Sequence, residues 1–246
     1  MGGSTLGNLA CWRRRNPPGT NASRPQPCCF KMNLEFQNQS IVLSGDGAVL
    51  LSDGTLVVAD LHLGKASAFQ AQGLAIPEGD SEADLKRLKA LCTWHEATRL
   101  VINGDLFHSP AGLTPHIEQL LETFVNDMRI PIELTLGNHD RKILRIPPFL
   151  SPKDSASYGG FQIIHDPADA TKGVPSVTAH WHPVVRIADG KRTNLRLPCF
   201  IVRGDMVILP SFGSFTGGQV IAPEKGDRFF VFPGEDVVEV PGELIR

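Results

Sequence analysis

Five apolar stretches of this chain each run into a polar corner, and this recurrence sharply limits how the chain can fold. The corner residues are aspartate, asparagine or histidine, namely Asp60 with His62, Asp105, Asn138 with His139, His165, and His180 with His182. In α/β sheets, ligands bind at the carboxyl ends of the strands, so these corners predict one convergent site. Where two corner residues are two positions apart, we expect their side chains to share one strand face and to bind the same ligand.

The pattern of apolar residues predicts alternating strands and helices in the first half of the chain. We expect three short strands within 40–60, further strands at 99–107, 131–140, 161–166 and 176–183, and a strand-rich region after Pro198. Helices are expected over 81–96 and 113–127, the first beginning with a capping box of Ser81 and Asp84. Because residues 32–246 show no repeat and no internal linker, we expect one domain with two packed sheets and helices outside.

The first 31 residues differ in composition from the rest of the chain. They contain five basic residues and no acidic one, are rich in glycine, proline and serine, and show no apolar periodicity. This composition predicts a disordered N-terminal extension. A transit peptide is an alternative interpretation of the arginines. We favour Met32 as the natural start, since the strand pattern begins there.

Charge and cysteine content exclude several classes of protein. The net charge is −2 in total, so the chain after residue 31 carries about −7, and any nucleic-acid contact must be local. The five cysteines form no C-x-x-C motif, which argues against a disulfide framework or a cysteine zinc site. This usage fits a reducing compartment, and we expect a cytoplasmic protein. No apolar run approaches the length of a membrane span.

The corner residues have the chemistry of a metal site. Oxygen and imidazole ligands without thiolate suit Mn²⁺ foremost, with Fe or Zn²⁺ as alternatives. Seven potential ligands are too many for one ion and fit two divalent ions that share a bridging carboxylate. Two such ions lie about 3.5–4 Å apart and clamp the attacking and leaving oxygens of a phosphoryl displacement. Two divalent ions, two aspartates and one hydroxide together carry a charge of about +1, which attracts a phosphate ester.

The ordered series D-L-H, G-D, G-N-H-D, H and H-x-H-P resembles the calcineurin-like metallophosphoesterases. That resemblance implies an α/β fold, the four-layer αββα sandwich of the metallo-dependent phosphatases. It also implies two ligand sets, Asp60, His62, Asp105 and His182 for one metal, and Asp105, Asn138, His165 and His180 for the other. Ala179 stands where the family usually has glycine, and we expect this change to be tolerated.

The same resemblance assigns roles around the G-N-H-D motif. His139 resembles the residue that stabilises the transition state and protonates the leaving oxygen, and Asp140 is expected to orient it. His108 and Arg141, each next to a corner, are further candidates for substrate binding, with a solvated surface role as the alternative.

A narrower resemblance is to the bacterial ligase-associated DNA damage response phosphodiesterases. It rests on DLHLGK, GDLFHS, GNHDR, HDP, HPVVRI and the tail motif LPSFGSFTGG at 209–218. These proteins are described as predicted endonucleases associated with a DNA ligase and a helicase, so the resemblance implies a DNA substrate and those two partners. Its last part, GSFTGG at 213–218, lacks the lysine of a P-loop, and we expect this stretch to form a tight corner near the site.

Three functions remain open from the sequence. The leading hypothesis is a two-metal phosphodiesterase, a DNA endonuclease of the DNA damage response, in which a metal-bound hydroxide attacks the phosphodiester. The second is hydrolysis of a small phosphodiester, nucleotide or pyrophosphate-linked substrate, which the acidic body favours. The third, a non-enzymatic scaffold, is disfavoured because neither the catalytic histidine nor any ligand is missing.

Overall fold

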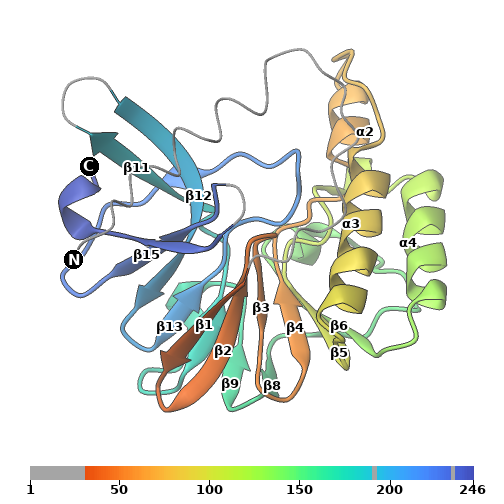
Figure 1. Cartoon of the computed structure of the whole chain (residues 1–246). Coiled ribbons are helices and arrows are strands. Elements are labelled where there is room, and N and C mark those ends of the chain that lie inside the picture. Colours follow the sequence, from red (N-terminus) through yellow and green to blue (C-terminus); the bar gives the residue numbers. More distant parts are fainter. Residues whose placement is uncertain (1–30, 190–192, 234–235) are drawn as a thin grey trace.

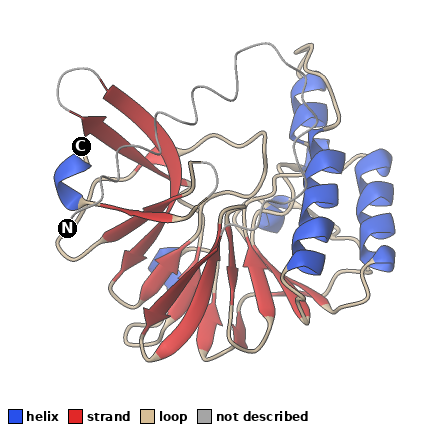
Figure 2. Ribbon diagram, in the orientation of Figure 1, coloured by secondary structure: helices blue, strands red, loops and turns tan. Residues whose placement is uncertain are grey.

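The computed structural model describes residues 31–189, 193–233 and 236–246, which form two β-sheets with α-helices on one side (Figures 1 and 2). The first sheet contains β1 (Lys31–Phe36), β2 (Gln39–Ser44), β3 (Ala48–Leu50), β4 (Thr55–Val58), β5 (Arg99–Asn103), β6 (Ile132–Thr135) and β7 (Pro152–Lys153), in that spatial order. Strands β1 to β4 are antiparallel neighbours, and β4 to β7 run parallel. The predicted disorder of residues 1–31 lies outside the described residues, apart from Lys31.

The second sheet has the spatial order β14-β11-β12-β13-β10-β9-β8, with β15 paired to β12 and β16 paired to β15. These strands are β8 (Ala156–Tyr158), β9 (Phe161–Ile163), β10 (Ser176–Thr178), β11 (Pro183–Asp189), β12 (Thr193–Arg203), β13 (Met206–Ile208), β14 (Gln219–Val220), β15 (Arg228–Val231) and β16 (Val238–Val240). The strands predicted from the apolar pattern are therefore confirmed, including the strand-rich region after Pro198.

In the described part of the chain, α3 (Asp80–Trp94) and α4 (Pro115–Asp127) cover the outer face of the first sheet, and the short helix α2 (Lys65–Gln70) lies beyond the ends of the strands (Figure 1). Both predicted helices are confirmed as α3 and α4. Helix α4 begins where the sequence favours it, because the Thr114 hydroxyl accepts a hydrogen bond from Ile117 N and a proline follows at the first helical position. None of the described helices is long and apolar enough to cross a membrane.

The capping box predicted for α3 is wrong. The helix begins after Gly79, and no side chain caps it. Ser81 and Asp84 are both buried, and their side chains bind other segments: Ser81 Oγ accepts a hydrogen bond from Gly64 N, and Asp84 binds Ser214. A tertiary contact has therefore taken the groups that a local cap would have used.

Alternating side chains of the sheets form three apolar clusters. Leu56 and Val58 of β4 pack against the helices, whereas Val57 between them faces the second sheet. On β12, Phe200 belongs to the same intersheet core, and Cys199 points to the opposite face.

The outer face of the second sheet is covered differently from that of the first. Its cluster packs against Trp181, Ile187, Leu244 and Ile245, so curled strands and the C-terminal segment cover it where the first sheet has α-helices. The short 3₁₀ helix η4 (Gly242–Leu244) lies in that segment. The α/β architecture with two packed sheets confirms the predicted fold class, while the outer layer on this side is reduced among the described residues.

Candidate metal centre

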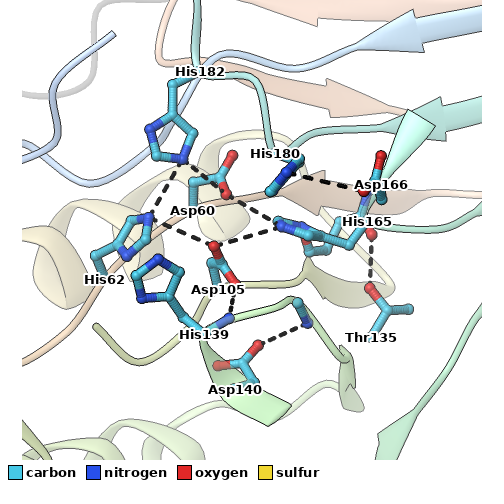
Figure 3. A network of polar contacts seen from close by, with 12 residues as sticks. Asp60, His62, Asp105, Thr135, His139, Asp140, His165, Asp166, His180 and His182 are labelled. Atoms are coloured by element: carbon cyan, nitrogen blue, oxygen red, sulfur yellow. Dashed lines mark hydrogen bonds and ion pairs between the residues drawn. The ribbon is translucent and has the colours of Figure 1, made fainter. Parts of the chain in front are cut away.

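The predicted corner residues converge where strands of both sheets end (Figure 3). The corners after β4 and β5 extend the parallel pairing of these strands, because Asp60 N donates to Gly104 O and His62 N donates to Asp105 O. The second sheet supplies His165 after β9, and His180 and His182 after β10. Asn138 after β6 lines a hollow of about 300 Å³ together with His165 and His180.

The ligand pairs converge through their backbone conformation and not through strand alternation. Five of the expected ligands have left-handed φ values: Asp60 at 56°, His62 at 50°, Asp105 at 49°, His180 at 69° and His182 at 45°. Non-glycine residues rarely adopt this conformation, which costs about 1–3 kcal/mol each and is concentrated at functional sites. The expectation that the paired residues share one strand face is therefore wrong in its mechanism, although the pairs do converge.

The first group of potential ligands comprises Asp60, His62, Asp105 and His182. His182 Nε2 lies 3.2 Å from Asp60 Oδ1 and 3.3 Å from His62 Nε2, and His62 Nε2 lies 3.9 Å from Asp105 Oδ2. The side chains of Asp60 and Asp105 are buried. Their arrangement brings two carboxylates and two imidazoles around one point.

The second group shares Asp105 with the first. It comprises Asp105, His165 and His180, and His165 Nε2 lies 3.6 Å from Asp105 Oδ2. Asn138 stands beside this group in the same hollow, at an exposed position. Asp105 is thus the carboxylate that the two groups of potential ligands have in common.

Two of the histidines are held in a defined orientation by backbone carbonyls. His165 Nδ1 is 2.8 Å from Asn103 O, and His182 Nδ1 is 3.2 Å from Gly217 O. A carbonyl only accepts, so in the neutral ring the proton lies on Nδ1 and the Nε2 lone pair faces the centre. Such outer hydrogen bonds commonly fix the tautomer of metal-binding histidines.

Buried polar atoms without a well-formed hydrogen bond show that the site fits metal ions. Both carboxylate oxygens of Asp60 and Nε2 of His165 are buried and make no hydrogen bond of good geometry among the described residues; Asp60 Oδ1 has imidazole nitrogens at 3.2 Å and 3.8 Å, and His165 Nε2 lies 3.6 Å from Asp105 Oδ2. Burying such groups without well-formed partners is costly, and a cation would satisfy all three atoms. The oxygen and nitrogen donors suit a divalent ion such as Mn²⁺, Fe²⁺ or Zn²⁺.

The protonation states around the centre have clear physical causes. Burial lowers the pKa of His62 to about 3, so its imidazole stays neutral, as a ligand must. Burial alone would raise the pKa of Asp105, but hydrogen bonding and the charge of His165 lower it to about 2. Burial would lower the pKa of His165, but Asp105 and Asp60 raise it to about 9. A metal ion must therefore displace a proton from His165.

His139 lies at the edge of the first group. Its ring centroid is 4.9 Å from that of His62, and its backbone N donates to Asp105 Oδ1 at 2.8 Å. The Nδ1 atom donates to His108 O, so Nε2 is the atom left to act on a substrate.

Asp140 does not orient His139, contrary to the expectation. Its carboxylate accepts hydrogen bonds from Phe107 N at 3.0 Å and Gly137 N at 3.1 Å, because the 3₁₀ helix η2 (Asp140–Lys142) turns it into the protein. Burial raises the pKa of this carboxyl to about 6. Asp140 thus ties the corner after β6 to the corner after β5, and the carbonyl of His108 takes the expected orienting role.

The two candidate substrate-binding residues lie on different sides of the centre. The ring of His108 stacks on that of His139, with centroids 5.5 Å apart. Arg141 lines the hollow with Asn138 and forms an exposed ion pair with Asp154 at 2.7 Å.

The tail motif forms the tight corner that the sequence predicted. Phe212 N donates to Ala59 O, and Gly213 N donates to Asp60 O, so the loop 209–218 lies along the first ligand corner. A Cβ atom on Gly213 would lie 2.3 Å from Leu61 O, so only glycine fits there. The same loop supplies Gly217 O, which holds His182.

Sequence reasoning missed the residues that fix this loop. Asp84 of α3 accepts hydrogen bonds from Ser214 N at 2.7 Å and from Ser214 Oγ at 3.1 Å. Arg87 donates to Asp84 and to Phe212 O, and its guanidinium lies over the Phe212 ring. The sequence signal for this contact is Asp84 itself, an aspartate next to the apolar stripe of a helix, but its position near the start of the helix also fits a capping box.

Residues 55–209 match the model of the calcineurin-like phosphoesterase family, so the chain belongs to that family and is a metal-dependent phosphoester hydrolase. Among solved structures, the chain is similar to the Pseudomonas putida nuclease MPE, with 29% identity and a TM-score of 0.69. The match covers 82% of this chain and 97% of the nuclease. No match was found among curated proteins.

Proposed function

We propose that this protein is a two-metal phosphodiesterase that cleaves DNA internally as part of the DNA damage response. The observation that supports it most is the sharing of Asp105 between two ligand groups, with His139 beside them. Two divalent ions bound there would supply Lewis-acid charge and activate water for attack on phosphorus. Manganese is the ion we propose first.

The protein's own residues would position the reacting groups and move one proton. Asp60, His62 and His182 would hold one ion, Asn138, His165 and His180 the other, with Asp105 between them. The His108 carbonyl holds His139 Nδ1, so a protonated His139 would donate from Nε2 to the leaving oxygen. Asp140 would keep this corner in place through its bonds to Phe107 N and Gly137 N.

DNA as substrate draws support from the similarity to a solved nuclease and from the tail motif. A functional association with a DNA ligase and a helicase is proposed from the family resemblance alone. The cytoplasm is proposed as the compartment because Cys92 and Cys199 are free, buried thiols.

A second candidate is hydrolysis of a small phosphodiester or nucleotide. It is favoured by the acidic side chains of Asp154, Asp166 and Asp169, which line the hollow beside the second ligand group and would repel a polyanion.

Nicking of supercoiled circular DNA by the Mn²⁺-loaded protein separates these functions. A circle has no ends, so nicking that is lost in Asp105→Ala would establish an endonuclease. Intact circles, with hydrolysis of a small chromogenic diester by the same sample, would assign the enzyme to small substrates instead.

A further inference from the structure

A row of aromatic rings leads from His139 to the protein surface. The His139 ring stacks on His108, the His108 centroid lies 5.7 Å from that of Phe69, and the Phe69 centroid lies 6.0 Å from that of Phe215. Phe69 belongs to α2, and Phe215 belongs to the loop 209–218. Phe215 is 37% exposed, although its neighbour in the motif, Phe212, is buried.

Two lysines accompany these rings. Lys65, the first residue of α2, places Nζ 5.5 Å from the centroid of the Phe215 ring. Lys65 and Lys142 both lie close enough to His108 for their charges to lower the pKa of its imidazole, after the larger effect of burial. Asp80, at the start of α3, lies close enough to interact with the charge of Lys65, and the described residues form no close ion pair with this amine.

The opposite flank of the centre has the reverse charge. Asp154, Asp166 and Asp169 line the hollow there, and the charge of Arg141 is paired with Asp154. A nucleic-acid strand carries a negative charge at every phosphate, so it is favoured over the lysine flank and disfavoured over the aspartate flank.

We propose that Lys65, Phe69 and Phe215 form a subsite for the nucleotide on the leaving-group side of the scissile phosphate. The base stacks on the exposed ring of Phe215, which Phe69 supports from the edge, and the flanking phosphate pairs with Lys65. We place the subsite on the leaving-group side because the row of rings begins at His139, which would protonate the leaving oxygen. This inference rests on the proposed cleavage of DNA.

The test compares two oligonucleotides of equal length, one with normal bases and one built from stable abasic nucleotides, cleaved by the full-length Mn²⁺-loaded protein. Stacking of one base on an aromatic ring changes binding by about tenfold or more, so the wild type should have a KM about tenfold lower for the intact strand. Phe215→Ala should lose this difference, while Phe215→Trp should keep it. Val238→Ala, which trims another hydrophobic residue of 37% exposure, is the matched control and should behave as wild type.

The lysine is tested through ionic strength. Lys65→Ala should raise KM for both strands and lower the slope of log KM against log salt by about one, as loss of one phosphate contact does. Lys172→Ala, an exposed lysine elsewhere, should leave both quantities at their wild-type values.

Three results would overturn the subsite. Phe215→Ala could keep the wild-type difference between intact and abasic strands, or it could lower kcat equally on both, which would mean that it acts through the loop and His182. In either case DNA cleavage by the wild type would still stand. If the wild type cleaves neither strand but hydrolyses methyl p-nitrophenyl phosphate, the proposed DNA function fails and the subsite fails with it.

Discussion

At the scale of single residues, the metal centre is built from strained backbone. The left-handed conformation of Asp60, His62 and His182 turns their side chains toward one point. The sequence does not indicate this conformation for the two histidines, as a glycine would. The residue types and their order could be predicted from the sequence, because the chemistry of metal binding selects them. Their backbone conformation could not, because it depends on hydrogen bonds to distant segments, such as those from Asp60 N to Gly104 O and from His62 N to Asp105 O.

Gly104→Ala should destabilise the protein and displace His165. Gly104 has a φ of +77°, and a Cβ atom there would lie 2.1 Å from His165 Nδ1. We expect a loss of about 2–4 kcal/mol in the free energy of unfolding, measured by urea denaturation, with weaker Mn²⁺ binding. Gly73→Ala is the control, since it has a φ of +85° but no atom within 4 Å of the added Cβ, and it should cost only about 1 kcal/mol. Equal losses in the two variants would show that crowding of His165 is unimportant.

His139→Ala should keep both metal ions and slow turnover by about 10²–10⁴-fold, because the proposed general acid is lost while all seven proposed ligands remain. Metal content by atomic absorption and kcat on a phosphodiester check the two parts. Full activity in this variant would remove His139 from the mechanism.

At the scale of elements, the loop 209–218 is attached to the centre by helix α3. Asp84 binds Ser214, and the loop's Gly217 O holds His182. The strands, both long helices and the tight corner at 213–218 were predictable from the period of apolar residues and from turn residues. The role of Asp84 was not, since its partner lies 130 residues away in the chain and a local capping pattern offered a competing explanation.

Asp84→Ala should lower the free energy of unfolding by about 3 kcal/mol or more and weaken Mn²⁺ binding, because it leaves Arg87 without its buried carboxylate and frees the loop. Urea denaturation and calorimetric titration measure the two effects. Asp127→Ala removes the α4 partner of Lys89 in an exposed ion pair between α4 and α3 and should cost no more than about 1 kcal/mol. If the Asp84→Ala protein bound Mn²⁺ as tightly as the wild type, attachment of the loop by Asp84 would not be needed for metal binding.

At the scale of the whole molecule, the two sheets supply different parts of one centre. Asp60, His62 and Asp105 follow strands of the first sheet, and His165 and His182 follow strands of the second. Bound metal would therefore join the two halves of the fold. An ion at one hundred times its Kd stabilises a protein by about 2.7 kcal/mol, so metal removal should lower the Tm.

This metal-dependent stabilisation should grow as the pH rises from about 6.5 toward 9. The folded, metal-free protein holds a proton on His165 with a raised pKa of about 9. The stability from that proton is fully present below 6.5 and is lost as pH rises toward 9, and a metal ion competes with it. Tm values with and without Mn²⁺, under nitrogen, measure the difference. A difference that stays flat or shrinks over this range would contradict the assignment of His165 as a ligand.

The central claim is that two ligand groups share Asp105, and metal stoichiometry tests it most directly. Titration of the metal-free protein with Mn²⁺ should give two ions per chain for the wild type, one for His180→Ala and none for Asp105→Ala. A wild-type protein that binds a single ion, or an Asp105→Ala variant that still binds two, would contradict the shared carboxylate and the two-metal mechanism built on it.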